Sequence, residues 1–309
     1  MKEMDFTEIT TPIITGSSPE GARDFVIPSR NYHGKFYALP QAPQIYKQLL
    51  MVSGFNRYFQ IAPCFRDEDC RADRTLEFYQ LDFEMSFATD EDVYEVGEKV
   101  FYNTFKNFTD KYVSPIPFKR IPFKEAMLKY GCDKPDLRNP LIIEDASDIF
   151  ENSEFNGFKG KTVRCIKCQN VSKSNSWFKH LEEFVKSKGA SGLAYLKKQD
   201  GEIKSAILKF LSNEEINLLS ERFTLEDNDV LFILAGDEHI IKVAGLLRNY
   251  LGEELELIDH NRYEFCIVND FPFYEYNEED KKWDFGHNPF SMPQGGIDAL
   301  NNMNPGDIV

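Results

Sequence analysis

The stretch "CFRDEDCRADRTLEFYQLDFEMSF", residues 64–87, joins a dense cluster of charges to an alternating segment. From Leu76 onward apolar residues recur at every second position, which is the period of a β-strand. One face of this strand is apolar, and we expect it to be buried in a core; it carries Tyr79, Leu81, Phe83, Met85 and Phe87. The other face is mostly polar and carries Phe78, Gln80, Asp82, Glu84 and Ser86.

The run from Tyr58 to Arg66 alternates in the same way and places Gln60 and Arg66 on one face. Two strands joined by a polar link predict an antiparallel hairpin with a long loop. A sheet with one solvated face would show this pattern too. Arginine, however, binds phosphate or carboxylate through two parallel hydrogen bonds, and an aromatic ring can stack on a base. Carboxylates accept from ammonium groups or bind Mg²⁺, so the polar face is a candidate site.

The composition of the chain limits its class. Its 309 residues suffice for about two domains, and 27 Phe residues can supply a sizeable core. No stretch approaches the ~20 apolar residues of a membrane span, and the start does not resemble a secretory signal. Six Cys residues do not form a dense disulfide framework, which favours a reducing compartment. A net charge of −15 argues against attraction to nucleic acid by the global field.

Helix signals flank the hairpin on both sides. Pro43 and Gly54 delimit a predicted helix whose Leu49, Leu50 and Val52 can pack inward. Gln44 and Lys47 lie together on its first turn, although Lys47 taken alone is also typical of a surface lysine. A second helix is predicted over residues 89–109, where Thr89 and Asp92 form a capping-box pattern.

Beyond residue 133 the pattern changes. Residues from about 138 to 258 alternate helical and strand segments and predict a self-contained α+β unit, and strand-like segments return from 262. Cys165 and Cys168 have the spacing of half a zinc site, but no second pair follows, so we interpret them as ordinary free thiols and predict no metal site. His180 and His239 lie in predicted helices and are interpreted as surface residues.

Several long strings resemble one family: "SSPEGARDF", "KFYALPQAPQIYKQLLMVSGFNRYFQIAPCFRDED", "RADRTLEFYQLDFEMSF", "YGCDKPDLRNP" and "IVNDFPFYE". In type and order they are similar to the bacterial-type aspartyl-tRNA synthetases of class II, over almost the whole chain. The resemblance implies an α+β fold, with an antiparallel catalytic sheet flanked by helices and interrupted by a smaller α+β insertion domain. The implied domains are 1–135 (first part of the catalytic core), 136–260 (insertion domain) and 261–309 (return to the core).

The resemblance also implies roles on the polar face, where the hairpin corresponds to the family's motif 2. Arg66 would be the catalytic residue, contacting the α-phosphate and the substrate carboxylate. The implied ATP-binding residues are Arg66, Asp67, Glu68, Thr75 and Phe78, with Phe78 stacked on adenine. The implied aspartate-binding residues are Glu20, Gln44, Lys47, Arg66, Asp82 and His287, with Lys47 paired to the side-chain carboxylate. A neutral asparagine amide would leave that cation unpaired.

The implied reaction joins L-aspartate and ATP into aspartyl-adenylate and transfers the aspartyl group to the 3′ end of tRNA(Asp), and possibly of tRNA(Asn). The resemblance implies a cytoplasmic homodimer without a membrane segment, and it implies Mg²⁺ with ATP. The family's anticodon-binding barrel, its principal Mg²⁺-binding glutamate and its motif 3 arginine have no match here, so we expect a fragment of a longer protein. Ala42, Thr75 and Asn288 also depart from the family pattern, and we expect them to tune the pocket.

Two other functions fit the same scaffold. One is a non-catalytic paralogue that binds aspartate, adenylate or a protein partner. The other is a free-standing ligase that makes asparagine from aspartate and ammonia. The predicted insertion domain favours the tRNA ligase, since such free-standing relatives lack it.

Overall fold

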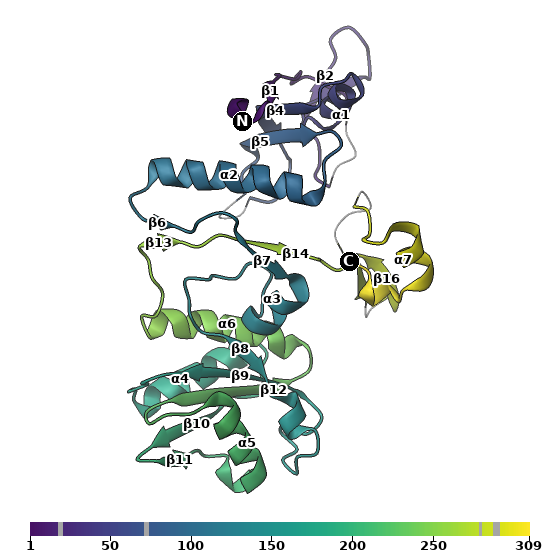
Figure 1. The fold of residues 1–309 in the computed structure, drawn as a ribbon. Helices are drawn as coiled ribbons and strands as arrows, with labels where there is room; N and C mark the ends of the chain where they lie inside the picture. The colour runs from purple at the N-terminus through teal and green to yellow at the C-terminus, as the bar shows by residue number, and fades with distance from the viewer. Residues whose placement is uncertain (18–20, 71–73, 278–279, 287–290) are drawn as a thin grey trace. The chain divides into compact units, whose positions relative to one another are not determined.

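The predicted hairpin is present in a computed structural model that describes residues 1–17, 21–70, 74–277, 280–286 and 291–309 (Figure 1). Its strands are β4 (Arg57–Phe65) and β5 (Glu77–Met85), which pair antiparallel over nine residues. The pairing sets Gln60 opposite Asp82 and Cys64 opposite Phe78. The short strand β1 (Thr7–Glu8) lies parallel to β4 and completes a three-stranded sheet.

Helices and a second hairpin complete the unit Met1–Phe108. The second hairpin is formed by β2 (Val26–Pro28) and β3 (Phe36–Ala38), and the helices are α1 (Gln44–Val52), α2 (Asp90–Phe108) and the short η1 (Lys2–Met4). Thr89 and Asp92 hydrogen-bond reciprocally where α2 begins, as the capping pattern predicted. A small core joins the sheet to α2 and is made of Phe6, Phe59 and Val96, with Phe83, Met85 and Val100 packed against it.

The prediction that the whole apolar face of β5 is buried is wrong. Phe83 and Met85 reach the core, but Tyr79 is 69% exposed, Leu81 38% and Phe87 99%. The opposite, polar face is the better covered one, because α1 packs against both strands of the hairpin. Asp82 is only 7% exposed there. On α1 itself Leu49 and Val52 are exposed, so their predicted inward packing is also wrong.

The unit Thr109–Val309 is built around a five-stranded antiparallel sheet. Its order is β11 (Glu202–Lys204), β10 (Ala194–Gln199), β12 (Val230–Gly236), β9 (Thr162–Cys168) and β8 (Ile143–Asp145). One face packs against α4 (Asn175–Ser187) and α6 (His239–Glu254). The other face packs against α5 (Asn213–Phe223) and the short helices η2 (Ser147–Phe150) and η3 (Leu208–Phe210). This helix–sheet–helix arrangement confirms the predicted α+β character of the segment.

Shorter elements complete the same unit. Parallel pairs join β6 (Tyr112–Val113) to β13 (Arg262–Tyr263) and β7 (Lys119–Pro122) to β14 (Cys266–Asn269). The remaining elements are α3 (Phe123–Tyr130), the hairpin β15 (Tyr274–Asn277) and β16 (Lys282–Phe285), α7 (Gly296–Asn302) and η4 (Pro305–Asp307). The domain boundaries at 135 and 260 stay predictions. Among the residues described, no helix is both long and apolar enough to cross a membrane.

Arg248 is the largest fully buried side chain among the residues that the structure describes, and it anchors α6. Its Nε donates to the Leu141 carbonyl at 2.6 Å, and its Nη2 donates to the carbonyls of Asp136 and Asn139 at 3.0 and 2.7 Å. Its guanidinium also lies over the ring of Tyr130, 5.0 Å from the centroid. Burial lowers the pKa of Arg248 from its usual value, which marks the cost of enclosing a cation among carbonyls.

We expect Arg248→Met to lower the free energy of unfolding of this unit by about 3–5 kcal/mol, because three carbonyls, two of them in buried hydrogen bonds, lose their donor. Urea unfolding measures the loss. The matched control is Arg138→Met, since Arg138 pairs with Asp136 at 2.7 Å but its side chain is 31% exposed. That change should cost about 1 kcal/mol or less. Equal losses in the two variants would contradict the anchoring role of Arg248.

Candidate functional site

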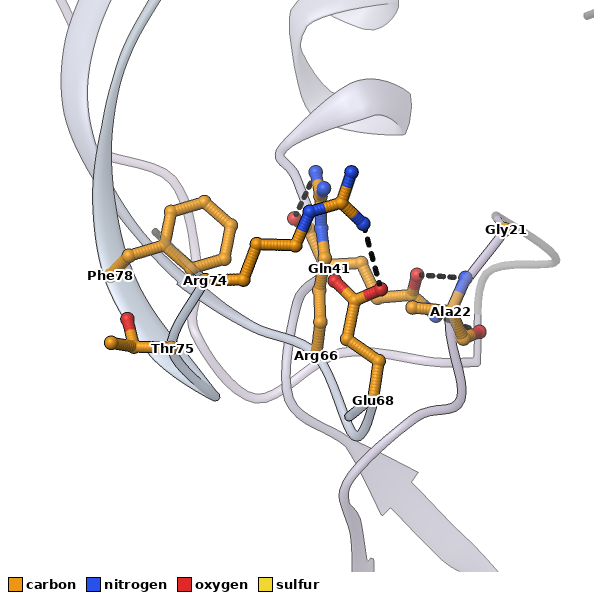
Figure 2. A pocket seen from close by; sticks show the side chains of 8 residues that line it. All are labelled: Gly21, Ala22, Gln41, Arg66, Glu68, Arg74, Thr75 and Phe78. Carbon is orange, nitrogen blue, oxygen red and sulfur yellow. Dashed lines mark hydrogen bonds and ion pairs between the residues drawn. The ribbon is translucent and has the colours of Figure 1, made fainter. Parts of the chain in front are cut away.

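A cavity of about 580 Å³ lies where the link of the hairpin meets the segment after Gly21 (Figure 2). Its lining residues come from three stretches of the chain and are Gly21, Ala22, Gln41, Arg66, Glu68, Arg74, Thr75 and Phe78. Four of the five residues predicted to bind ATP therefore lie around one cavity. The fifth, Asp67, is exposed, and its backbone N–H donates to the Arg23 carbonyl at 3.0 Å.

Arg66 and Phe78 lie on the same side of the hairpin, as the alternation predicted. The Cζ atom of Arg66 is 5.1 Å from the centroid of the Phe78 ring. A guanidinium at this distance is attracted by the negative face of the ring, and the ring in turn limits where the cation can point. The pair presents a delocalised cation and a flat apolar surface to the same cavity, which suits a ligand that carries both a phosphate and a base.

Arg74 is a lining residue that the sequence did not single out. Its Nη1 is 3.7 Å from Oε2 of Glu68, and both side chains are partly exposed (Figure 2). An exposed pair of this kind contributes little to stability. It adds a second guanidinium to the cavity, so an anionic ligand would meet two arginines. Thr75 lies beside it, and its hydroxyl donates to the Glu77 carbonyl at 2.7 Å.

A second polar cluster lies farther along the same face. Lys47 of α1 reaches across to β5, where its Nζ is 3.0 Å from Oδ1 of Asp82 and 3.3 Å from Oε2 of Glu84. Burial alone would lower the pKa of Lys47, but the hydrogen bonds and charges of Asp82 and Glu84 outweigh it and hold this pKa above its ordinary value. Lys47 is therefore a fixed cation at neutral pH.

Asp82 has one oxygen to spare. Its Oδ2 is buried and has no hydrogen-bond partner among the residues that the structure describes, and the same holds for the hydroxyl of Tyr58. Burial, aided by the charge of Asp82, raises the pKa of the Tyr58 phenol well above its usual value, so the phenol stays neutral. A buried carboxylate with an unsatisfied acceptor is costly in isolation and is suited to receive a cationic ligand.

The two clusters are spaced along one strand. Phe78, Gln80 and Asp82 share a face of β5, and four residues of strand place Asp82 about 13 Å from Phe78. Gln44 is the first residue of α1, one turn before Lys47, and it is half-buried. This span is long enough for a nucleoside phosphate at one end and an amino acid at the other. Glu20 and His287 lie outside the described residues, so their predicted roles stay predictions.

Sequence reasoning missed Gln41 and Arg74 as parts of these clusters. The alternation did place Glu84 on the same face of the strand as Asp82, but Glu84 was given no role of its own. Gln41 and Arg74 lie in irregular segments where no periodicity indicates a direction. Their positions follow from contacts between segments distant in the sequence.

The other candidate residues of the sequence show no site of their own. Cys165 and Cys168 are buried, free thiols of β9, and their side chains pack into the cores on opposite faces of the sheet. Burial raises the pKa of Cys168 to about 12, and that of Cys165 further, so both stay protonated. His180 and His239 are exposed, as predicted.

Phe78→Ala is expected to weaken ATP binding by about 1–3 kcal/mol, roughly five- to 150-fold in Kd, because a base loses its stacking surface. The Kd for aspartate should change much less, since Asp82 and Lys47 remain in place. Calorimetric titration of the full-length gene product with each substrate measures both values. Tyr79→Ala is the matched control, because Tyr79 is an exposed aromatic on the opposite face of β5. Equal losses for the two substrates would count against stacking on Phe78.

Comparison with known proteins places this geometry in a family. The family model for tRNA synthetases class II (D, K and N) matches residues 1–305. A protein of Rickettsia akari (strain Hartford) named Aspartate--tRNA(Asp/Asn) ligase is 55% identical over 311 residues, which cover 98% of this chain and 52% of the relative. The protein of the same name from Rickettsia prowazekii (strain Madrid E) is 55% identical over 304 residues, which cover 96% of this chain and 50% of the relative.

The chain thus spans about half the length of the curated relatives it matches. The matched region nevertheless includes both polar clusters and the five-stranded sheet, because it runs through nearly all of the sequence. The motif strings that suggested the resemblance fall within it. The chain belongs to the class II tRNA synthetases of the D, K and N group.

Proposed function

We propose that the protein is an aspartate–tRNA ligase that activates L-aspartate with ATP and transfers it to the 3′ end of tRNA. The observation that carries this proposal is Lys47, a cation with only 14% of its side chain exposed, which Asp82 and Glu84 hold on the polar face of the hairpin. The name of the relatives, Aspartate--tRNA(Asp/Asn) ligase, supports the same amino acid. The tRNA substrates are then tRNA(Asp) and tRNA(Asn).

The amino-acid end would work by exchange of ion pairs. In the substrate-free arrangement Lys47 neutralises Asp82 and Glu84. The α-ammonium of aspartate would become the counterion of Asp82, with Gln44 beside it, and Lys47 would turn to the substrate's side-chain carboxylate while staying near Glu84. Lys47 then has a carboxylate partner and Asp82 a cationic partner in both states. Asparagine would offer Lys47 only a neutral amide, which leaves a desolvated cation without a counter-charge.

The nucleotide end would use Arg66 and Phe78. The substrate carboxylate attacks the α-phosphorus, a P–O bond to pyrophosphate breaks, and negative charge builds on the non-bridging oxygens. Arg66 would pair with that charge and orient the attacking carboxylate, while Phe78 stacks on adenine and Glu68 accepts from its amino group. A ribose hydroxyl of the tRNA then attacks the acyl carbon, and AMP leaves. Positioning and electrostatics supply the acceleration, and no covalent enzyme intermediate is needed.

Mg²⁺ is expected to accompany ATP. In the described ranges of the chain no three His, Cys, Asp or Glu side chains cluster as metal ligands would. These residues do not fit a resident Mg²⁺ site. We further propose that the full protein is a cytoplasmic homodimer, as the family resemblance implies.

Aspartate-dependent exchange of pyrophosphate into ATP, measured on the full-length gene product, tests the proposal. Exchange with aspartate and none with asparagine or lysine is the expected result, followed by charging of purified tRNA(Asp) and tRNA(Asn). Absence of exchange would favour the non-catalytic paralogue. Exchange without charging, together with ammonia-dependent asparagine formation, would favour the free-standing ligase.

A further inference from the structure

Gln41 is a buried amide, 2% exposed, at the back of the nucleotide-sized cavity. It binds one residue through both ends of its side chain: its Oε1 accepts from the Ala22 N–H at 3.3 Å, and its Nε2 donates to the Ala22 carbonyl at 3.0 Å (Figure 2). The same Nε2 also donates to Asp24. The side chain therefore pairs with the segment Ala22–Asp24 much as a neighbouring strand would.

Two further contacts close a ring around Gln41. Arg23 and Asp67 form an isolated antiparallel bridge, in which the Asp67 N–H donates to the Arg23 carbonyl at 3.0 Å. Arg66 Nη2 donates to the Gln41 carbonyl at 3.4 Å, a long contact that Figure 2 also shows. Three segments are thus linked pairwise: Ala22–Asp24, Gln41, and the pair Arg66–Asp67. We call this ring the Gln41 junction.

The Gln41 junction connects the two polar clusters. On one side it holds Ala22 and Arg66, which line the cavity. On the other side Gln41 lies three residues before α1, the helix whose first turn carries Gln44 and Lys47. In the described part of the unit, no other buried side chain that lines the cavity bonds to the Ala22–Asp24 segment. Loss of this one amide would therefore loosen two binding regions together.

We infer that Gln41 is a positioning residue that couples the binding of the nucleotide to the binding of the amino acid. The inference rests on the proposed function and deepens it, since it describes how two substrates of one site influence each other. A ligand on Arg66 would order the junction, and the order would extend through Gln41 to the start of α1. The second ligand then binds to segments that are already ordered, so it does not lose conformational entropy in ordering them. This gives positive cooperativity.

Titration calorimetry of the full-length gene product measures this coupling. Aspartate is titrated with and without α,β-methylene ATP, which cannot be cleaved at the α-phosphorus. In the wild-type protein the analogue should tighten aspartate binding by about fivefold or more, the lower end of typical coupling. In Gln41→Ala the factor should fall toward one, and kcat/KM for aspartate-dependent exchange should fall about ten- to a hundredfold, as expected for lost buried hydrogen bonds.

The matched control is Gln48→Ala, because Gln48 is an exposed glutamine of α1 that is not part of the junction. It should keep the wild-type coupling factor. Asp24→Ala removes one contact of the Gln41 amide and should reduce the coupling less than Gln41→Ala. If Gln41→Ala does not fold, the coupling factors of Asp24→Ala and Gln41→Asn are compared with that of the wild type. Both variants keep a side-chain amide at position 41.

Trypsin cleavage after Arg23 provides a readout that does not depend on activity. The Arg23 carbonyl is bonded to Asp67 in the intact junction, so cleavage should be slow in the wild type and in Gln48→Ala, and several-fold faster in Gln41→Ala. A wild-type protein without coupling, or a Gln41→Ala variant with unchanged coupling and cleavage, overturns the inference alone. A wild-type protein that binds neither substrate removes the proposed function, and the inference with it.

Discussion

Lys47→Ala is expected to lower kcat/KM for aspartate in pyrophosphate exchange by about 10³-fold while leaving the Kd for ATP within about twofold. Breaking a buried ion pair costs about 3–5 kcal/mol, because the remaining charge keeps its desolvation penalty. Here the loss is incurred twice: Asp82 and Glu84 lose their counterion, and the substrate's side-chain carboxylate finds no cation. Since the pKa of Lys47 is held above its ordinary value, an assay at pH 7–8 compares a charged with an uncharged position.

The control for this result is Lys99→Ala. Lys99 belongs to the same unit and is also paired with a carboxylate, Oε1 of Glu95, but its side chain is 41% exposed. Its removal should leave exchange unchanged, because exposed pairs contribute little. Unchanged exchange in Lys47→Ala would remove Lys47 from substrate recognition. An equal loss of ATP affinity would show that the substitution disturbs the whole face and not the amino-acid end alone.

The sequence alone predicts those parts of the site that depend on the alternation of residues along a strand. Period-two patterning assigns Phe78 and Asp82 to one face, and the polar link predicts that β4 and β5 form a hairpin. The start of α2 just after Thr89 was also predictable, because the cap depends only on Thr89 and on Asp92, three residues later. Features that depend only on neighbouring residues are present in the sequence itself.

Contacts between distant segments were not open to prediction in this way. Gln41 bonds to Ala22, 19 residues earlier, and Lys47 bonds to Asp82, 35 residues later. No local period encodes either pairing. The exposure of Tyr79 and Leu81 has the same origin: alternation predicts which residues share a face but not which face another element covers. In this unit α1 covers the polar face, and the core reaches only the end of the apolar one.

Arg66→Ala is expected to reduce the turnover of pyrophosphate exchange by about 10³- to 10⁵-fold, the range seen when a cation that stabilises a phosphoryl-transfer transition state is removed. Its guanidinium is the one group that the proposed mechanism assigns to both reacting partners, the α-phosphate and the substrate carboxylate. Arg66→Lys retains the charge but loses the planar fork, so it should recover only a small part of the activity. Rapid-quench measurement of adenylate formation separates this loss from weaker binding.

The contrast with Phe78→Ala makes the assignment of Arg66 testable. In the proposed mechanism Phe78 would stack on a base in both the bound substrate and the transition state, so its loss should appear mainly in the Kd for ATP. Arg66 would meet the charge that develops during transfer, so its loss should appear mainly in the rate of adenylate formation. Arg30→Ala, at an exposed arginine between β2 and β3, should change neither quantity. An Arg66→Ala variant that keeps more than about a tenth of the wild-type rate would fall outside the effect expected of a transition-state cation, and the chemistry would then have to be assigned to another group, with Arg74 the nearest candidate in the same cavity.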